Sequence, residues 1–316
     1  KRQRLGPANC SIEVEGARMI GRRRFIAISA AAAGSSLIGT SSAKRSETVW
    51  HGRAFGADAH IILRGNNAAT AMQAALDTIQ RLERYFSIYD PGSLVSKLNR
   101  TGRLTMPPEF ARLMDEVQTV HQATDGLFDP TVQPLFATKL RPQDSTASPT
   151  VGWHHVKRTA AQIRFKAPGM AITLNGIAQG FATDRVSEVL AAYGFGSILV
   201  NIGEYKIGGE PASLIIENTR GKALGKQWLS NAAMATSSRH GFIFSNGAGH
   251  ILKPDGSQAP VVWETTSVVA SSATRADGYS TALILSPDLT LAERLIADGQ
   301  IQSVVLEKTD GAITRR

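Results

Sequence analysis

Two segments of the chain repeat their apolar residues every three or four positions, and this spacing constrains the fold more than any other feature. Residues 68–86 and 108–124 both follow this pattern. It places the apolar side chains on one face of an α-helix, which must then be buried against another element. Residues 180–193 and 276–285 predict two further helices, and Gly194 is well placed to end the first of them.

Short runs rich in β-forming residues lie between the predicted helices. Residues 59–63, 197–202, 213–217 and 266–271 predict strands. Because helices and strands do not alternate strictly, the order favours an α+β fold over a doubly wound parallel sheet. No long linker, repeat or low-complexity tract follows residue 45, so residues 46–316 are predicted to form one domain.

Composition narrows the class of protein further. Apolar residues make up 42% and charged residues 19% of the chain, which is typical of a globular protein. No run approaches the roughly 18 apolar residues of a membrane-spanning helix, so stable membrane insertion is not expected. Cys10 is the one cysteine, which excludes a disulfide framework or a thiolate metal cluster.

The basic charge of the chain is concentrated in residues 1–45. This segment carries nine Lys or Arg and two Glu, which accounts for +7 of the net charge of +9. A nucleic-acid-binding protein would need a basic face on its folded part, so no nucleic-acid partner is expected.

The same segment predicts an export signal. Arg22, Arg23 and Arg24 precede an apolar run rich in Ala and Gly, and small residues at 41–43 offer a cleavage site. Consecutive arginines resemble a twin-arginine signal, which exports folded proteins, and an ordinary secretory signal is the alternative. Met19 is a possible true start. We therefore expect residues 1–45 to be an N-terminal extension with a cleaved twin-arginine-like signal, and the mature protein to be periplasmic.

Four segments of the folded part carry residues suited to chemistry or binding. Residues 89–93 contain Asp-Pro-Gly, which taken alone predicts a turn. Residues 125–134 form a Pro- and Gly-containing loop that either faces a ligand or connects two elements. Residues 173–182 bring two glycines to a helix start, where backbone N–H groups and the helix dipole favour an anion.

The fourth segment, residues 274–281, opens a helix. Asp277 and Thr281 are four residues apart, so their oxygens share one helix face and could be ligands of Mg²⁺. The alternative is an Asp that interacts with the helix dipole and a Thr that bonds to its own helix. The usual fingerprints of dinucleotide-binding and phosphate-binding loops are absent from the sequence.

His250 lies just before a predicted tight turn. Histidine is the usual general base near neutral pH, although a single loop histidine is more often structural. The remaining histidines show no metal-ligand spacing, so no zinc site is expected.

The order of these motifs along residues 50–290 resembles the ApbE family of FAD:protein FMN transferases. The motifs that carry the resemblance are Phe55-Gly56-Ala57, Tyr89-Asp90-Pro91, Phe128-Asp129-Pro130-Thr131-Val132, Gly176-Ile177-Ala178-Gln179-Gly180, Ala235-Thr236-Ser237, His250 to Gly256 and Ala276-Asp277 to Thr281. The resemblance implies an α+β fold and an enzyme that uses FAD as substrate together with Mg²⁺. Such an enzyme transfers FMN to a threonine hydroxyl of an acceptor protein as a phosphoester and releases AMP.

The resemblance also implies roles for individual residues. His250 and Asp277 are expected to be catalytic, with His250 the base for the acceptor hydroxyl. The magnesium ligands are expected to be Gly176, through its backbone oxygen, Asp277, Ser280 and Thr281. The residues expected to bind FAD are Phe55, Tyr89, Leu127, Phe128, Asp129, Thr173, Gln179 and Leu252.

Three positions depart from the usual family pattern and keep two other functions open. The family usually has Asp at Thr173, Lys at Gln179 and an acid in place of Lys253. The alternatives are a Mg²⁺-dependent FAD pyrophosphatase, in which water replaces threonine, and a periplasmic FAD-binding protein without chemistry. The leader and this divergent core resemble the NosX branch, which implies maturation of nitrous-oxide reductase with the periplasmic flavin domain of NosR as acceptor.

Overall fold

A computed structural model describes residues 47–140, 149–241, 243–244, 249–257 and 259–316. The predicted export signal in residues 1–45 lies outside this part of the chain. No helix among the described residues is both long and apolar enough to cross a bilayer.

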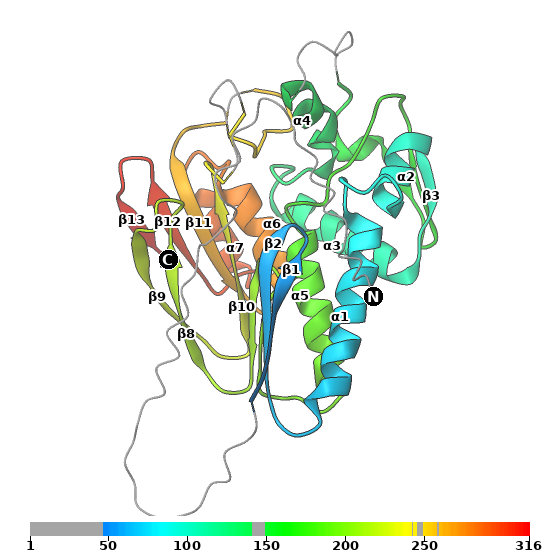
Figure 1. Ribbon diagram of the computed structural model, residues 1–316. Helices are drawn as coiled ribbons and strands as arrows, with labels where there is room; N and C mark the ends of the chain where they lie inside the picture. Colours follow the sequence, from blue (N-terminus) through cyan, green and yellow to red (C-terminus); the bar gives the residue numbers. More distant parts are fainter. Residues whose placement is uncertain (1–46, 141–148, 242, 245–248, 258) are drawn as a thin grey trace, which may run out of the picture.

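An eight-stranded antiparallel sheet forms the centre of the fold (Figure 1). Every pairing in it is antiparallel, from the β1–β2 hairpin at one edge to β12–β13 at the other. In sheet order the strands are β1 (Glu47–Ala54), β2 (Ala57–Arg64), β6 (Ile198–Asn201), β7 (Tyr205–Gly208), β10 (Ala232–Ser238), β11 (Trp263–Ala270), β12 (Ser303–Lys308) and β13 (Ile313–Arg315).

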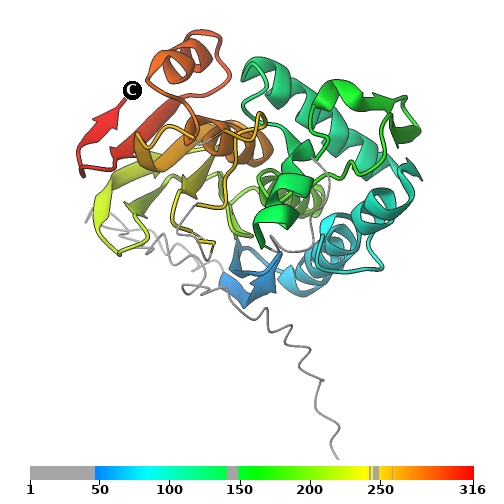
Figure 2. The ribbon, with the colours of Figure 1, turned by 90° about the horizontal axis from the view of Figure 1, so that it is seen from above.

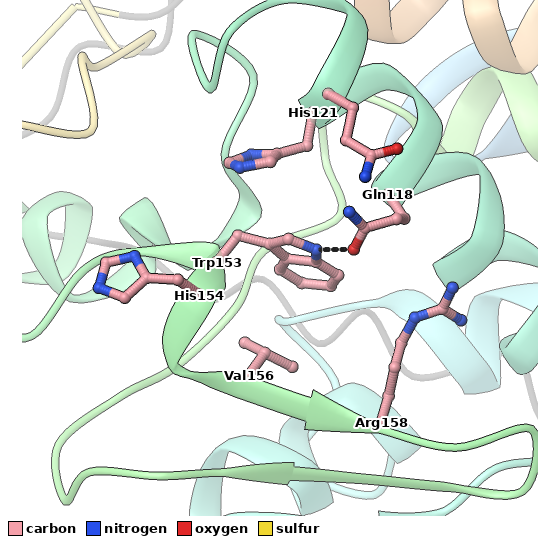
Figure 3. A pocket seen from close by; sticks show the side chains of 7 residues that line it. Gln118, His121, Trp153, His154, Val156 and Arg158 are labelled. Atoms are coloured by element: carbon pink, nitrogen blue, oxygen red, sulfur yellow. Dashed lines mark hydrogen bonds between the residues drawn. The ribbon is translucent and has the colours of Figure 1, made fainter.

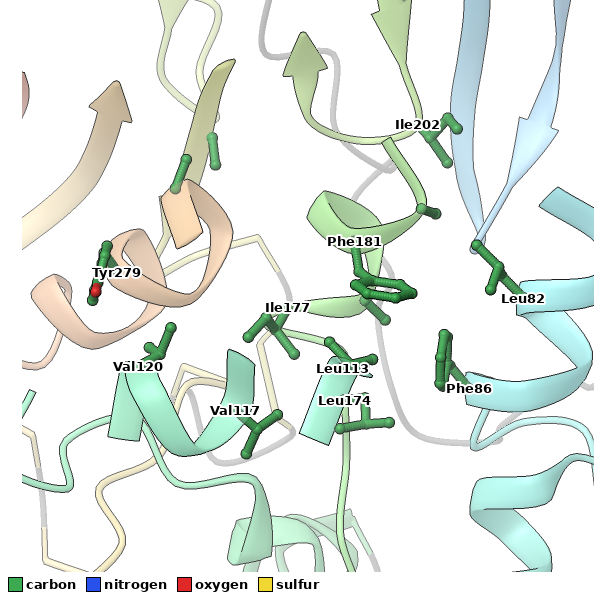
Figure 4. Packing of buried hydrophobic residues seen from close by; sticks show 14 of the residues in the cluster. Leu82, Phe86, Leu113, Val117, Val120, Leu174, Ile177, Phe181, Ile202 and Tyr279 are labelled. Atoms are coloured by element: carbon green, nitrogen blue, oxygen red, sulfur yellow. The ribbon is translucent and has the colours of Figure 1, made fainter. Parts of the chain in front are cut away.

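Helices cover one face of this sheet (Figures 1 and 2). They bury the main hydrophobic core, in which Phe86 packs edge-on against Phe181 with ring centres 5.7 Å apart (Figure 4). The helices of this layer are α1 (Ala68–Phe86), α3 (Pro108–Ala123), α5 (Ala178–Ala192) and α6 (Ala273–Leu283).

A separate two-stranded sheet covers part of the other face. It consists of β8 (Ala212–Glu217) and β9 (Ala223–Leu229). Leu214, Leu224 and Leu229 of this hairpin belong to a second, smaller core together with Tyr205 and Met234 of the large sheet. The fold is therefore layered, with helices, a central sheet and a two-stranded sheet that each bury an apolar face.

The remaining elements lie at the ends of these layers. They are α2 (Leu94–Thr101), β3 (Arg103–Thr105), η1 (Pro130–Val132), α4 (Gln133–Leu140), η3 (Trp153–His155), β4 (Val156–Arg158), β5 (Gln162–Phe165) and α7 (Thr290–Ala297). Strands β3, β5 and β4 form a third small sheet in that order.

The α+β prediction is confirmed, and most expected elements lie within three residues of their predicted bounds. Two details were wrong. The strand at 59–63 was expected to open the fold, but β1 precedes it as its hairpin partner. The helix predicted from 180 begins at Ala178, so Gly180 lies inside its first turn and not before it.

Candidate active site

Residues 173–181 lie where most of the predicted motifs meet. The Thr173 N–H donates to the Pro130 carbonyl at 2.8 Å, which ties this segment to the loop 125–134. The Asn175 side-chain amide lies 3.5 Å from the Tyr89 hydroxyl, which brings in the turn after α1. Tyr89 remains 65% exposed, so its ring is open to a ligand. Motifs that are up to 86 residues apart in the sequence are therefore in contact in the fold.

Helix α6 approaches the same segment from the other side. The Thr281 hydroxyl lies 3.4 Å from the Gly176 carbonyl, and the Gly180 N–H donates to Asp277 Oδ2 at 3.1 Å. The Ser280 hydroxyl instead turns toward β10, where it lies 2.8 Å from Ser237 Oγ and donates to the Asp277 carbonyl at 3.0 Å. All four predicted magnesium ligands are therefore neighbours.

The donor atoms in this cluster suit a hard divalent cation. They comprise one carboxylate, one backbone carbonyl and two hydroxyls, which are the oxygen ligands that Mg²⁺ prefers when it keeps several of its waters. No group of three or more His, Cys, Asp or Glu residues capable of holding a metal occurs within the described ranges. A cation here would depend on Asp277 for protein charge, because Ser280 and Thr281 are neutral.

Gly180 allows α5 to approach α6 closely enough to form this cluster. A Cβ at this position would lie 2.2 Å from the Ala273 carbonyl oxygen and 2.9 Å from the Asp277 Cβ. We expect Gly180→Ala to lower the free energy of unfolding by about 2 kcal/mol, because overpacking against backbone costs about 1–3 kcal/mol and outweighs a gain in helix propensity of about 1 kcal/mol.

Chemical denaturation followed by circular dichroism measures this change. Gly196→Ala is the matched control, because a Cβ there meets no atom within 4 Å. Equal stability of the Gly180→Ala variant and the wild type would mean that the helices can separate without cost.

The loop 125–134 is held from inside by Asp129. Its Oδ1 accepts from the Thr131 N–H at 2.8 Å and from the Thr131 hydroxyl at 2.6 Å, and its Oδ2 accepts from the Trp153 N–H at 3.0 Å. Phe128 is buried and its carbonyl lies 2.8 Å from His121 Nδ1, whereas Leu127 is half-buried. The Asp129 carboxylate therefore fixes the shape of the loop, and contact of these residues with FAD stays a prediction.

Phe55 is presented at the tip of the β1–β2 hairpin. Its φ of 49° lies in the left-handed region, which is strained for an aromatic residue. Its N–H donates to the Glu83 carboxylate on α1 at 2.7 Å, which holds the tip in place. Burial raises the pKa of Glu83, and the bond from Phe55 offsets part of that rise. The hydrogen bond to Glu83 therefore fixes the position of Phe55 at the tip of the hairpin.

Gln179 is buried at the first turn of α5 against the turn between β6 and β7. A Cβ on Gly203 would lie 2.5 Å from its side-chain nitrogen, so the amide lies directly on this glycine. The neighbouring Glu204 is 2% exposed and accepts from the Thr236 N–H at 3.1 Å. The adjacent residues Gly203 and Glu204 therefore connect Gln179 with the Ala235-Thr236-Ser237 motif.

His250 is half-buried on the segment that follows β10. A Cβ on Gly241 would lie 3.4 Å from its Cε1 atom, so the imidazole packs beside the residues at the end of β10. Leu252 is also half-buried, two residues further along. Gly256 lies near Leu135 of α4, with 3.7 Å between its ideal Cβ and the Leu135 Cδ2 atom. The segment 249–257 therefore lies between β10 and α4.

The sequence analysis did not identify Asp184, which fixes the start of α6. Its carboxylate accepts from the Ala273 and Thr274 N–H groups at 3.0 and 2.9 Å and from Lys206 Nζ at 2.6 Å. Burial alone would raise the pKa of Asp184, but Lys206 and the donors of α6 outweigh it and hold the pKa below its usual value. The available signal was a carboxylate one turn after Gly180, on the buried face of α5.

A pocket of about 350 Å³ lies beside this region, between α3 and the start of β4 (Figure 3). The Trp153 indole faces it and donates to Gln118 Oε1. Its lining residues are Gln118, His121, Gln122, Trp153, His154, Val156 and Arg158. None of the predicted site residues lines this pocket, so the candidate site is defined by the contacts around Gly176.

Comparison with known proteins identifies the family. The model of the ApbE family matches residues 50–304, which is most of the chain. The chain belongs to the ApbE family. Among curated proteins it is similar to the FAD:protein FMN transferase of Chlamydia pneumoniae, with 28% identity over 263 residues that cover 71% of this chain and 80% of the relative.

Solved ApbE structures share the fold. The flavin transferase ApbE from Vibrio cholerae superposes with a TM-score of 0.73 at 20% identity and covers 86% of this chain and 97% of its own. The ApbE protein from Thermotoga maritima gives a TM-score of 0.75 at 23% identity, with 85% and 97% covered. The three-layer arrangement described above is therefore the ApbE fold.

Proposed function

We propose that the chain is an FAD:protein FMN transferase, which moves the FMN part of FAD onto a threonine hydroxyl of an acceptor protein and releases AMP. The observation that carries this proposal is the meeting of Asp277, Thr281 and the Gly176 carbonyl at the N-terminus of α5. Family membership agrees with a transferase, and the curated relatives bear this activity in their names.

The start of α5 suits the diphosphate of FAD. The positive end of the helix dipole attracts anions, although the N–H groups of Ile177, Ala178 and Gly180 already donate to the Leu174 carbonyl and to Asp277. Residues 173–177 lead into this end of α5, and the fixed approach of Thr173 to Pro130 keeps the loop 125–134 beside it. We expect the phosphate oxygens of FAD to lie at this end of α5 while Phe55 and Tyr89 contact the flavin or its nucleotide.

The oxygen cluster fits Mg²⁺, which we expect to be held by Gly176, Asp277, Ser280 and Thr281. When bound it would neutralise diphosphate oxygens and stabilise the departing AMP. The part that Asp277 plays is to supply the negative charge that retains the cation, and Gly180 keeps this carboxylate in position through its N–H group.

His250 is proposed as the base that takes the proton of the acceptor threonine. We expect His250→Ala to slow FMN transfer by about a hundredfold, because a positioned base contributes about 10²–10⁴-fold. The affinity for FAD should change by less than threefold, since the imidazole acts on the acceptor. Transfer rates and fluorescence titration with FAD measure the two effects, and an equal loss of both would assign His250 to binding instead.

Covalent flavin fluorescence on an acceptor domain tests the function itself. The purified protein is incubated with FAD, Mg²⁺ and a threonine-containing acceptor, and AMP release is measured in parallel. A fluorescent acceptor band in a denaturing gel that disappears with EDTA supports the transferase. AMP without labelling would favour the FAD pyrophosphatase, and bound FAD without either product would favour a flavin-binding protein.

The biological setting is also a proposal. The twin-arginine-like leader favours work in the periplasm, and the NosX-like features favour a NosR-like flavin domain as acceptor. Labelling of a NosR-type domain in preference to other flavinylated domains is the comparison that tests this assignment.

A further inference from the structure

A histidine and a buried carboxylate form a close pair at the end of β10, next to the proposed site. His240 Nδ1 lies 2.6 Å from Glu264 Oε1. The Glu264 side chain is 9% exposed, whereas the His240 side chain is 40% exposed. One end of the imidazole is therefore fixed inside the protein while the ring remains accessible.

The hydrogen bond determines which imidazole nitrogen can take a proton. An ionised carboxylate accepts hydrogen bonds and cannot donate them, so Nδ1 carries the proton in the bond to Glu264. In the neutral ring Nε2 is then the unprotonated nitrogen. A carboxylate that fixes the tautomer and orientation of a histidine is the arrangement by which hydrolases activate a hydroxyl.

This pair lies close to the other site residues. Ser237, three residues before His240, lies 2.8 Å from Ser280 Oγ and 3.4 Å from Thr281 Oγ1. On the other side, the residue after His240 is Gly241, against which His250 packs. Residues close to His240 in the chain, on both sides of it, therefore contact the oxygen cluster and His250.

Arg239 also holds the end of β10 in place. The Arg239 N–H donates to the Glu264 carbonyl at 3.0 Å, and its side chain donates to the carbonyls of Trp263 and Pro260. Among the described residues, Glu264 pairs with His240, the charged Arg239 precedes it in the chain, and the titratable His250 packs against the next residue, Gly241. The end of β10 is thus held by bonds other than the one between His240 and Glu264.

We propose that His240, oriented by Glu264, accepts at Nε2 the proton that His250 takes from the attacking hydroxyl. This inference rests on the proposed FMN transfer. As the acceptor O–H bond breaks, the threonine oxygen bonds to the FMN phosphorus and the bond from that phosphorus to the bridging oxygen breaks. The electron pair leaves on AMP, the hydroxyl proton goes to His250, His250 passes a proton to His240 Nε2, and His240 later releases it to solvent.

The first test is His240→Gln, with His154→Gln as the matched control on the exposed end of η3. We expect His240→Gln to lower kcat for FMN transfer by about a hundredfold with little change in the KM for FAD, and His154→Gln to leave both unchanged. In His240→Ala, added imidazole should restore at least a tenth of the lost rate. A merely structural histidine would give no such rescue, so a loss without rescue overturns the proposal.

Glu264 is tested as a positioning residue with two variants. Glu264→Gln can donate its amide to Nδ1, which places the proton on Nε2 and blocks it, so a loss as large as that of His240→Gln is expected. Glu264→Asp keeps the charge and should retain more activity than Glu264→Gln. Equal rates of the two variants would overturn this role.

The activity of the wild-type protein distinguishes failure of the proposed role of His240 from failure of the proposed FMN transferase function. If it labels the acceptor and the His240→Gln variant does so at the same rate, this inference fails while the transferase stands. If the wild type itself neither labels an acceptor nor releases AMP, the proposed function fails.

Discussion

Replacing Asp277 with alanine is expected to lower metal-dependent FMN transfer by about a thousandfold. Asp277 is the single carboxylate of the oxygen cluster, and loss of a cation that stabilises the leaving phosphate removes several kcal/mol of transition-state stabilisation, of which about 4 kcal/mol corresponds to a thousandfold. Activity titrations with Mg²⁺ measure the effect together with the apparent metal affinity.

Asp277→Asn isolates the charge from the shape. Its side-chain oxygen can still accept from the Gly180 N–H, so the contact between α5 and α6 is kept while the negative charge is removed. We expect the same loss of transfer as in the alanine variant, with an unchanged circular dichroism spectrum. Asp298→Asn, at an exposed position after α7, is the control. Unchanged turnover in both Asp277 variants would remove this residue from the metal site.

The largest effect on stability is expected at Asp184. Replacing it with alanine removes one partner of a buried ion pair and strands Lys206 together with the N–H groups at the start of α6, a type of change that costs about 3–5 kcal/mol. Denaturant unfolding measures this loss. Glu188→Gln on the same helix is the control, because Glu188 is substantially exposed and its pairs with Arg112 and Arg185 should contribute about 1 kcal/mol or less.

The pH dependence of stability gives a second test of Asp184. Its pKa is lowered in the folded protein, so its contribution is fully present above the pKa of the unfolded chain, which is about 4, and is lost as the pH falls through the lowered folded value. The difference in stability between the wild type and Asp184→Asn should therefore shrink below about pH 4. A difference that is constant from pH 7 to pH 3 would show that the charge of Asp184 is not what stabilises α6.

The helices could be predicted from the sequence because the signal for each is local. The apolar spacing of residues 68–86 matches α1 residue for residue, and Gly194 has a φ of 86° just after α5, as expected for a residue that ends a helix.

Strand β10 was recognised only through its motif and not as a strand. Apart from Met234, its sequence, Ala-Ala-Met-Ala-Thr-Ser-Ser, consists of small and hydroxylic residues, and neighbouring elements provide partners for its buried hydroxyls.

The candidate site was predictable as a set of motifs but not as a network. Resemblance to the family identified Asp277 and Gly176, whereas nothing local pointed to Asp184 or to the pairing of His240 with Glu264. These contacts join residues 24 to 90 positions apart, and their partners depend on which strands and helices become neighbours. The sequence pattern determines which face of an element is buried, and the topology determines what that face meets.

The distances along the chain between the two sides of the oxygen cluster have a consequence for the order of folding. Gly180 meets Asp277 across 97 residues and Gly176 meets Thr281 across 105. Contacts this remote require large loops to close first, which makes them slow to form compared with the local turns of α1 or the β1–β2 hairpin. An unfinished chain that ends before α6 would have the glycine segment and the start of α5 but no carboxylate opposite them. The candidate site therefore cannot form until synthesis of α6 is complete.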